Sequence, residues 1–331
     1  MSIAIVILNW NGKALLEQFL PSVIKHSKAA AVYVADNAST DGSVAFVENE
    51  FPSVKIIKNA ENGGYAKGYN DALKQVDADI FCLLNSDVQV TENWLQPIID
   101  TFNAQPNTAI IQPKLLDFKK KDHFEYAGAA GGFIDKFGYP YCRGRIFNTV
   151  EKDSGQYNDV SEIFWASGAC LFVRKSVFEH LNGFDEHFFA HMEEIDLCWR
   201  AKNLGYSIKY VGDSAVYHVG GATLSNANPK KTFLNFRNSL FALTKNATGP
   251  ILVKMGVRLI LDGIAGIKFL LEQKPRHLFS ILRAHFSFYK SLGRLLKQRK
   301  ATVTKTKYYQ KTSIVFSYFI KGDKYYKKAN K

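Results

Sequence analysis

The sequence is 331 residues long, which is enough for one large domain or for one domain with an appendage. Hydrophobic residues make up 47% of the chain, so it can bury a sizeable core. It has no run of about 18 apolar residues, and its first residues lack a basic segment and a small-residue cleavage site, so neither a membrane span nor a signal peptide is expected.

The net charge of +13 indicates an anionic partner, namely nucleic acid, an acidic membrane surface or a phosphorylated ligand, with solubility alone as the alternative. The four cysteines form no CxxC pair and are expected to be reduced, mostly buried thiols of a cytosolic protein.

Strand and helix patterns alternate in the first part of the chain. Apolar, β-branched runs predict strands at Ile3–Leu8, Ala31–Ala35, Val54–Lys58 and Asp79–Leu84. A helical pattern follows each of the first three, the third of them over Tyr65–Val76. This alternation predicts a doubly wound, mostly parallel α/β sheet. Because ligands bind at the carboxyl ends of such strands, the polar residues that follow them should converge, and these are Asn9, Asp36, Asn62 and Asp87.

The rest of the chain is less regular. Glycine-rich residues from Pro113 to Ser161 predict long loops with a hairpin as an option. Beyond them we expect a strand over Glu162–Arg174, a helix over Glu193–Leu204 and strands over Ser207–Tyr210 and ending in Ala215–Val219. From Pro250 the pattern is helical and basic. The sequence thus predicts a domain of residues 1–240 and a basic, amphipathic helical C-terminal region of residues 241–331.

Two polar segments are candidates for nucleotide binding. Asp36 could accept a hydrogen bond from a nucleobase, or could form an Asx turn or a helix N-cap, the role that we assign to Asp41. In the segment from Asn62 to Asn70, glycines at the start of a helix let the backbone approach a phosphate or a ribose. Its GGxxxG spacing differs from the GxGxxG pattern of dinucleotide-binding proteins.

Three further groups could perform chemistry. Asp87, in Asn85-Ser86-Asp87, could hold Mg²⁺ or Mn²⁺ on a diphosphate, or could be a plain residue of a strand-to-turn junction. His218 ends a strand and is expected to be structural unless it meets Asp87. Glu193 and Glu194 could supply a general base with a raised pKa, or could be the acidic start of a helix. Asp196 is placed to pair with Arg200 four residues later.

Seven segments taken in order resemble glycosyltransferase family 2, an inverting family, over about residues 3 to 240. They are VILNWNG, VADNASTDGS, NGGYAKGYN, LLNSDV, WASGACLFVRK, GFDEHFFAHMEEIDLCWR and VYHVGG. The chain looks most similar to the rhamnosyltransferase-like branch, which builds bacterial surface polysaccharides. The resemblance implies a GT-A fold, a UDP- or dTDP-linked sugar donor and a glycan or lipid-linked acceptor.

The resemblance also implies residue roles. The donor would be bound by Asn9, Asn11, Asp36, Asn62, Gly63, Lys67, Asn85, Ser86 and Asp87. Asp87 and His218 would be the metal ligands, while Asn85 replaces the first acid of the family's DxD motif. Acceptor and donor sugar would meet near Trp165, Ser167 and Gly168. Glu194 takes the place of the family's usual aspartate base, and its neighbour Glu193 is the alternative.

Other classes of protein fit less well. A nucleotide-binding oxidoreductase would need GxGxxG after the first strand, and NWNGKA differs from it. A nucleic-acid-binding protein would explain the charge, but the charge is concentrated after residue 250 without a recognised motif, so no nucleic-acid partner is expected. A catalytically inactive scaffold is disfavoured by the intact Asp87, Glu194 and His218.

The C-terminal region predicts attachment to a membrane surface. Between Ile251 and Glu272 the charged residues fall within an arc of about 120° of a helix, and the rest of the circumference is apolar. A tail of lysines and aromatics follows. This is the pattern of a helix lying in the membrane interface, so we expect a cytoplasmic protein held peripherally at the inner face of the cell membrane by anionic lipids. The alternative is that these helices pack on the first domain or form a homodimer.

Overall fold

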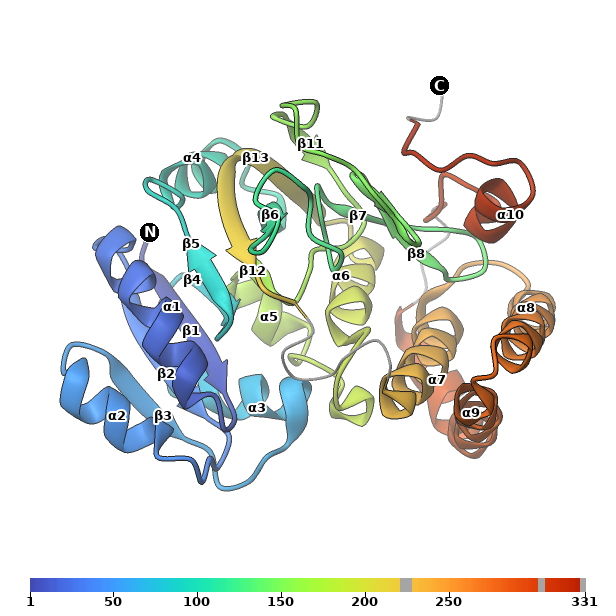
Figure 1. Ribbon diagram of the computed structural model, residues 1–331, viewed down its shortest axis with the longest axis horizontal. Coiled ribbons are helices and arrows are strands. Elements are labelled where there is room, and N and C mark those ends of the chain that lie inside the picture. The colour runs from blue at the N-terminus through green and yellow to red at the C-terminus, as the bar shows by residue number, and fades with distance from the viewer. Residues whose placement is uncertain (221–227, 303–306, 328–331) are drawn as a thin grey trace.

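The computed structural model describes residues 1–220, 228–302 and 307–327 (Figure 1). Its first half is a parallel sheet in the order β4-β1-β2-β3, and the strands are β1 (Ile3–Asn9), β2 (Ala31–Asp36), β3 (Lys55–Lys58) and β4 (Ile80–Asn85). Between them lie the helices α1 (Lys13–His26), α2 (Ser43–Glu50) and α3 (Gly64–Leu73). The predicted alternation of strands and helices is therefore confirmed.

The sheet continues beyond β4 with strands from later in the chain. The order is β4-β12-β6-β13-β11, where the added strands are β12 (Cys170–Arg174), β6 (Thr108–Asp117), β13 (Ser207–His218) and β11 (Val160–Glu162). The short β5 (Val88–Val90) also pairs with β13. β12 lies antiparallel between β4 and β6, while β6 and β13 are parallel, so the sheet is mixed. Helices α4 (Gln96–Ala104) and α5 (Lys175–His180) complete this half.

Several elements of the second half differ from the sequence prediction. The strand expected over Glu162–Arg174 is two strands, β11 and β12, because residues between them cross to Gly132, whose backbone bonds to Trp165. The two strands expected between Ser207 and Val219 are one strand, β13, with an irregularity between Val211 and Ala215. The expected loop region instead holds a small antiparallel sheet of β7 (Gly132–Ile134), β8 (Pro140–Cys142), β9 (Arg145–Ile146) and β10 (Thr149–Val150).

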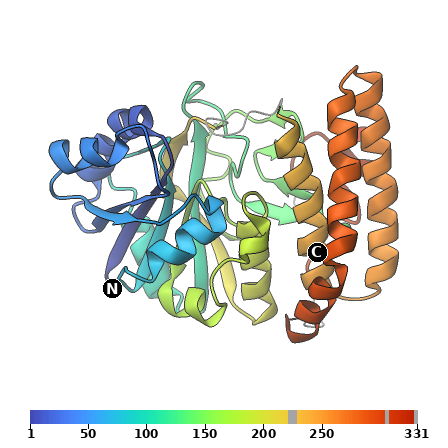
Figure 2. The same cartoon turned by 90° about the horizontal axis from the view of Figure 1, so that it is seen from below.

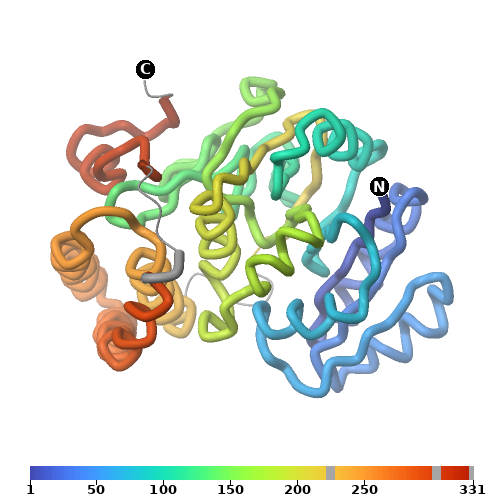
Figure 3. The backbone as a smooth tube through the Cα atoms, turned by 180° about the vertical axis from the view of Figure 1, so that it is seen from behind, coloured from blue at the N-terminus to red at the C-terminus, as the bar shows by residue number. Residues whose placement is uncertain are grey.

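Helices dominate the end of the chain. After the short helix η1 (Glu186–Phe188) come α6 (Glu193–Asn203), α7 (Pro229–Asn246), α8 (Ile251–Leu271), α9 (Pro275–Thr302) and α10 (Ile314–Phe319). Figures 1 and 2 show α7, α8 and α9 as a separate layer at one end of the molecule, and Figure 3 shows this layer far from α2 and β3. Within the described ranges, no helix is both long enough and apolar enough to cross a membrane.

The apolar residues form two cores, one on each face of the large sheet. Leu83 lies in one core and Leu8 packs against it, while Ile5 and Leu84 lie in the other core. All four cysteines are buried and free, as expected for reduced thiols. The strands are buried on both faces, which explains their continuous apolar sequences.

Lys254, Arg258 and Asp262 of α8 point inward, whereas many of its apolar residues point outward. Lys254, Arg258 and Asp262 are each at most 3% exposed, whereas Leu252 and Ile260 are 73% and 67% exposed. The sequence pattern placed the charged residues on one side of the helix and the apolar residues on the other, and in the structure the apolar side is the exposed one. The reason is that the charged groups find partners on the rest of the protein, since Arg258 donates to Ser239 at 2.6 Å and Tyr139 donates to Asp262 at 2.8 Å.

Residue 240 lies in the middle of α7, which packs against both α6 and α9. A continuous helix thus spans the expected boundary between residues 240 and 241. We propose that the C-terminal region is better counted from Pro250, directly before α8, because α7 also contacts the loop that precedes α6.

Candidate active site

The first polar cluster joins the carboxyl ends of β1 and β2. Asn9 and Asp36 are partners in the parallel register, and the Asn9 amide nitrogen donates to Asp36 Oδ1 at 3.1 Å. Asp36 Oδ2 accepts the backbone N–H of Ser39 at 2.9 Å, so this residue also shapes the turn after its strand. Asn9 Oδ1 is buried without a hydrogen-bond partner, which leaves an acceptor for a ligand. The predicted convergence of Asn9 and Asp36 is confirmed.

Two other predicted residues of this cluster hold the loops together. Asn11, with a φ of 49°, receives a hydrogen bond from the backbone of Thr40 at 2.7 Å. Asp41 accepts backbone N–H groups from Lys13 at 2.8 Å and from Ser43 at 3.0 Å. This structural role of Asp41 agrees with the sequence-based assignment.

The glycine segment at the start of α3 faces the loop before α6. Asn62 accepts a hydrogen bond from the backbone of Gly64 at 3.0 Å. Gly64 has a φ of +75°, and a Cβ atom there would lie 2.5 Å from the carbonyl oxygen of Phe189, so only glycine fits. That carbonyl accepts the backbone N–H of Tyr65 at 2.8 Å. The glycines therefore permit close approach between two parts of the protein chain.

The predicted donor-binding residues beside Gly64 are arranged locally. Gly63 immediately precedes α3, and a Cβ atom there would lie 2.7 Å from the side chain of Lys67. Lys67 forms ion pairs with Asp71 of the same helix and, at 3.5 Å, with Glu61. The Lys67 ammonium group is thus paired with two carboxylates.

Asp87 and His218 meet, as a metal site would require. β5 pairs with the end of β13, so His218 Nε2 lies 3.1 Å from Asp87 Oδ1. Asn85 also reaches this nitrogen, at 3.4 Å. On the other side of the ring, His218 Nδ1 lies 3.4 Å from Glu125 Oε1. Burial would lower the pKa of His218, but hydrogen bonds and charge from Asp87 and Glu125 raise the pKa to about 10.

These residues fit a divalent ion as a partial ligand set. Within the described ranges, no three His, Cys, Asp or Glu side chains are arranged to hold a metal ion by themselves. Mg²⁺ and Mn²⁺ are commonly held by one or two protein ligands together with substrate phosphates and water. Asp87 and His218 Nε2 would supply the protein ligands, and the Glu125 carboxylate beside Nδ1 would orient the ring, as carboxylates do for metal-binding histidines.

Glu193 and Glu194 are the first two residues of α6. Each has a buried Oε2 atom without a hydrogen-bond partner. Burial raises the pKa of Glu194 to about 7, and burial together with the charge of Glu194 raises that of Glu193 well above its usual value. A carboxylate with a pKa near neutrality can accept a proton at physiological pH, which suits a general base.

The loop that carries this pair is held by a residue that the sequence analysis did not single out. Phe189, His191 and Met192 have positive φ values, so the backbone before α6 is strained. Asn238 of α7 donates through its side chain to the carbonyls of Phe188, Ala190 and His191, at 2.9, 2.9 and 2.7 Å. Nothing in the sequence around Asn238 signals this role, because its partners lie almost fifty residues earlier.

Asp196 is structural, as predicted. Arg200 donates to its Oδ2 at 2.8 Å, Lys245 lies 3.0 Å from the same oxygen, and Asn246 donates to Oδ1 at 2.8 Å. Burial would raise the pKa of Asp196, but the cations of Lys245 and Arg200 lower it, so this carboxylate stays charged.

The residues expected near the acceptor lie between these groups. Tyr65 donates through its hydroxyl to the Gly168 carbonyl at 2.8 Å, and the backbone of Asn85 donates to the Ala169 carbonyl at 3.0 Å. The segment of Gly168 and Ala169 thus links the strand before Asp87 to the α3 side of the site. Ser167 lies beside it and donates its backbone N–H to Gln112 at 2.8 Å.

Trp165 lies deeper than the other expected acceptor residues. It is 3% exposed, and its indole N–H donates to the carbonyl of Phe133 at 2.8 Å. A Cβ atom at Gly132 would collide with its ring. Gly221, part of the VYHVGG segment, lies outside the described residues.

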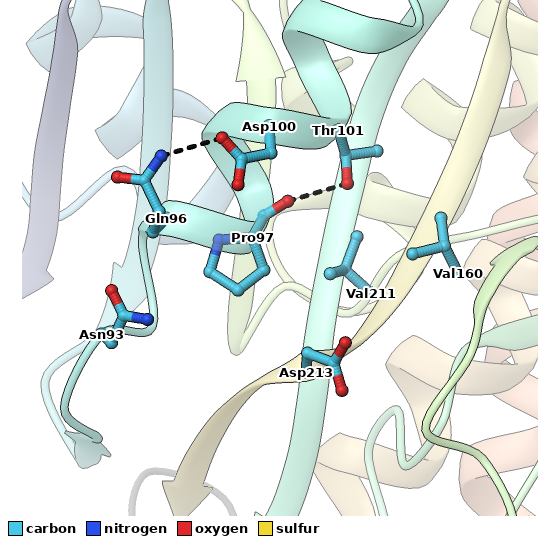
Figure 4. Close-up of a pocket in the computed structure, with 8 residues that line it drawn as sticks. All are labelled: Asn93, Gln96, Pro97, Asp100, Thr101, Val160, Val211 and Asp213. Atoms are coloured by element: carbon cyan, nitrogen blue, oxygen red, sulfur yellow. Dashed lines mark hydrogen bonds between the residues drawn. The ribbon is translucent and has the colours of Figure 1, made fainter.

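A surface hollow beside α4 holds none of these residues. Figure 4 shows its lining, which includes the carboxylates of Asp100 and Asp213. Gln96 donates to Asp100 at 2.8 Å and Thr101 donates to the carbonyl of Pro97 at 2.7 Å, so polar groups there serve the helix itself. The hollow therefore carries no functional argument.

Comparison with known proteins identifies the family of the chain. The model of the family described as "Glycosyl transferase family 2" matches residues 3–181. An N-acetylglucosaminyl-diphospho-decaprenol L-rhamnosyltransferase of Mycobacterium tuberculosis is 28% identical over 222 residues, which cover 61% of this chain and 71% of that protein. The low-salt glycan biosynthesis hexosyltransferase Agl10 of Haloferax volcanii is 21% identical over 83% of this chain and 87% of its own length.

Solved structures share the fold at low sequence identity. GalNAc-T7, solved with UDP, GalNAc and Mn²⁺, superposes with a TM-score of 0.58 at 15% identity, covering 74% of this chain and 48% of that one. The mannosyltransferase PcManGT of Pyrobaculum calidifontis, solved with GDP-Man and Mn²⁺, has a TM-score of 0.53 at 14% identity and covers 90% of this chain and 84% of its own. The fold is thus GT-A, that of nucleotide-sugar-dependent glycosyltransferases.

The protein is a glycosyltransferase, and its chain belongs to glycosyl transferase family 2, with a rhamnosyltransferase-like character. The oxidoreductase and nucleic-acid-binding alternatives are set aside by this membership.

Proposed function

We propose that the protein is an inverting, metal-dependent glycosyltransferase that moves a hexosyl or rhamnosyl group from a UDP- or dTDP-linked donor to a hydroxyl group. The observation that carries the proposal is the Glu194 carboxylate, whose buried Oε2 lacks a partner and whose pKa of about 7 suits proton removal from an alcohol. The loop before α6 is connected to the strand end that precedes Asp87, because Tyr65 donates its backbone N–H to the Phe189 carbonyl and its hydroxyl to the Gly168 carbonyl, and Asn85 donates to the neighbouring Ala169 carbonyl.

The chemistry is a single displacement. Glu194 takes the proton of the acceptor hydroxyl while that oxygen bonds to the anomeric carbon, and the bond from this carbon to the diphosphate oxygen breaks. The attacking oxygen approaches from the face opposite the leaving group, so the configuration inverts. A divalent ion, when held by Asp87 and His218, supplies positive charge that stabilises the leaving diphosphate.

The remaining residues have proposed roles in positioning the substrates. Asn9 offers its free Oδ1 and Asp36 its carboxylate to the nucleotide, and Asn11 keeps their loop in place. Asn62, Gly63 and Lys67 line the ribose and diphosphate side, with Lys67 exchanging its carboxylate partners for phosphate. Asn85 and Ser86 lead into Asp87. Ser167 and Gly168 border the place where the sugars meet, and Trp165 supports that border from the core.

The acceptor is proposed to be a lipid-linked or free glycan in bacterial surface polysaccharide synthesis. The name of the mycobacterial relative includes a diphospho-decaprenol acceptor, which supports a lipid-linked substrate. Such a substrate would be used by a cytoplasmic enzyme at the inner face of the membrane, attached peripherally through the region that follows the catalytic domain.

The proposal is tested by donor binding and by the product. UDP- and dTDP-sugars are screened for an increase in Tm with and without Mn²⁺, because a ligand of the native state stabilises it by mass action. The donor found is then used in a transfer assay with Glu194→Gln and with Glu193→Gln. We expect Glu194→Gln to retain donor binding and to lose transfer by about a hundredfold or more.

Three outcomes would contradict the proposal in different ways. If Glu193→Gln has that phenotype and Glu194→Gln does not, the other acid is the base. A product whose anomeric configuration is retained, as read by NMR, would exclude the single displacement. Donor binding without any transfer or hydrolysis by the wild type, across glycan and lipid-linked acceptors, would favour an inactive scaffold.

A further inference from the structure

Helix α8 is oriented opposite to an ordinary surface helix. Its charged residues Arg258 and Asp262 are buried, and Arg258 also donates to Ser239 of α7 at 2.6 Å. Lys254 donates to the Thr248 carbonyl at 2.6 Å and to the Tyr308 hydroxyl at 2.8 Å. Buried charges are tolerated when they are paired or hydrogen-bonded: Arg258 and Asp262 form an ion pair, and Lys254 donates to two oxygen atoms. These bonds fix which side of α8 faces the protein.

The opposite side of α8 and α9 presents apolar residues to the exterior. The outer apolar face, as we call it, includes Ile260, Ile264 and Ile267 of α8 and Phe279, Leu282 and Phe286 of α9, whose exposed fractions run from 44% to 68%. The two helices pack against each other, and Figure 1 shows them as the layer farthest from the large sheet. Contiguous apolar surface of this kind marks a contact with another molecule or with a membrane.

The charge around this face is predominantly positive, and the acidic exception is Glu272 at the end of α8, which forms ion pairs with Lys268 and Lys274. Residues 273–322 contain twelve Lys and Arg residues and no Asp or Glu. On α9 the exposed cations Arg276, Arg283 and Lys290 alternate with the apolar residues of the face. Lys268 is exposed at the end of α8, where it lies over the ring of Phe319.

This charge pattern decides between a membrane and a second copy of the chain. In a homodimer built on this face, the cations of one α9 would lie against those of the other, and like charges at an interface are costly. A bilayer with anionic lipids offers phosphate groups at the level of the cations and hydrocarbon at the level of the apolar side chains. Amphipathic helices rich in Lys and Arg bind membranes in this way.

We infer that the outer apolar face inserts into the boundary between headgroups and acyl chains of an anionic bilayer. The inference rests on the proposed function in one respect, since a lipid-linked acceptor gives the contact its purpose. The geometry suits that purpose: Thr232, near the start of α7, bonds to His277 near the start of α9 at 2.7 Å. The α8–α9 turn thus lies at the same end as the start of α7, and Figure 2 shows this end beside the carboxyl edge of the sheet.

The inference is tested with the full-length protein and phospholipid vesicles. Flotation is compared on vesicles of phosphatidylcholine alone and of phosphatidylcholine mixed with phosphatidylglycerol, at low and high salt. The test variant is Ile260→Ser/Ile264→Ser/Ile267→Ser, and Phe279→Ser/Phe286→Ser is an independent second variant. Val160→Ser/Leu204→Ser, which changes exposed apolar residues of the catalytic domain, is the matched control.

We expect the wild type and the control to float with the mixed vesicles, more strongly at low salt, and each test variant to bind at least about tenfold more weakly. Binding of both test variants at the wild-type level would overturn the inference, as would failure of the wild type to bind mixed vesicles at low salt. A wild-type dimer that both variants convert to monomers, without vesicle binding, would assign the face to a second copy instead.

Thermal shift with the donor is measured on the same samples. Because the substituted residues are exposed and lie outside the active site, all variants should bind the donor as the wild type does. If the wild type binds vesicles but transfers no sugar, the proposed function alone is refuted. If the wild type transfers sugar but does not bind vesicles, the membrane contact alone is refuted.

Discussion

Replacing Glu194 by glutamine should stabilise the protein at alkaline pH. The folded state raises the pKa of Glu194 from 4.5 to about 7, so this group contributes stability below its unfolded pKa that is lost as the pH rises through 7. At 1.36 kcal/mol per pKa unit, ionisation of Glu194 should lower the free energy of unfolding of the wild type by about 3 kcal/mol at pH 8 and by less than about 1 kcal/mol at pH 5. Glu194→Gln removes that loss, so its advantage in the free energy of unfolding should grow by about 2 kcal/mol between the two pH values.

Urea denaturation followed by circular dichroism at pH 5 and pH 8 measures the difference. Glu17→Gln, at an exposed position of α1, controls for the loss of a negative charge. Glu193 is the nearest acid, and burial raises its pKa too, so Glu193→Gln should show the same sign of effect. If Glu194→Gln alters stability equally at both pH values, the carboxylate is not desolvated in the folded protein, and the argument for it as the base loses its physical support.

Three further perturbations test other parts of the structure. Asp87→Asn should abolish Mn²⁺-dependent binding of the donor nucleotide in isothermal titration calorimetry; metal-dependent binding at wild-type strength would remove Asp87 from the metal site. Glu125→Ala should weaken Mn²⁺ affinity by about tenfold or more, because His218 loses the carboxylate beside Nδ1, and electron paramagnetic resonance titration with nucleotide present would detect the free ion. An unchanged affinity would show that Glu125 does not orient the ring. Arg258→Met should cost about 3–5 kcal/mol in urea unfolding, because it leaves Asp262 buried without its closest cation, and the added change Asp262→Leu should recover most of the loss. A loss below about 1 kcal/mol in the single variant would mean that this pair does not hold α8 in place.

The first half of the fold could be predicted because its sequence signals are local. β1 and β4 are continuous apolar runs, and the polar residues that follow them stop the strands within one residue of the predicted ends. The general rule that parallel strands meet ligands at their carboxyl ends then predicted the contact between Asn9 and Asp36. Neither inference needed information from distant parts of the chain.

The second half depends on distant partners, which local patterns cannot indicate. β6 carries the polar residues Gln112 and Lys114 and a proline, yet it is buried, because Lys114 pairs with Asp153 at 2.8 Å and Gln112 bonds to the backbone near Gly128. Glu125 reaches His218 only because the chain folds back beside β6 through the bridge between Leu116 and Phe124. Glu125 lies in the glycine-rich stretch from Pro113 to Ser161 for which the sequence predicted long loops, and no motif marks it.

Helix α8 illustrates a different limit. Its periodicity correctly indicated one charged and one apolar side, but periodicity does not say which side faces the protein. Tyr139 and Ser239, which form hydrogen bonds with the charged side of α8, lie in distant parts of the chain. The usual assumption that the apolar side packs inward therefore fails for this helix.

The long strand β13 has a consequence for how the protein is made. It covers one edge of β6, pairs with β5 and delivers His218 to Asp87. Until residue 218 has left the ribosome, the growing polypeptide carries β6 as an open edge, the kind of surface that pairs with other unfinished chains. A truncated gene ending between β12 and β13 would keep that edge open permanently, so the nucleotide-binding half should aggregate when it is expressed without the residues that follow it.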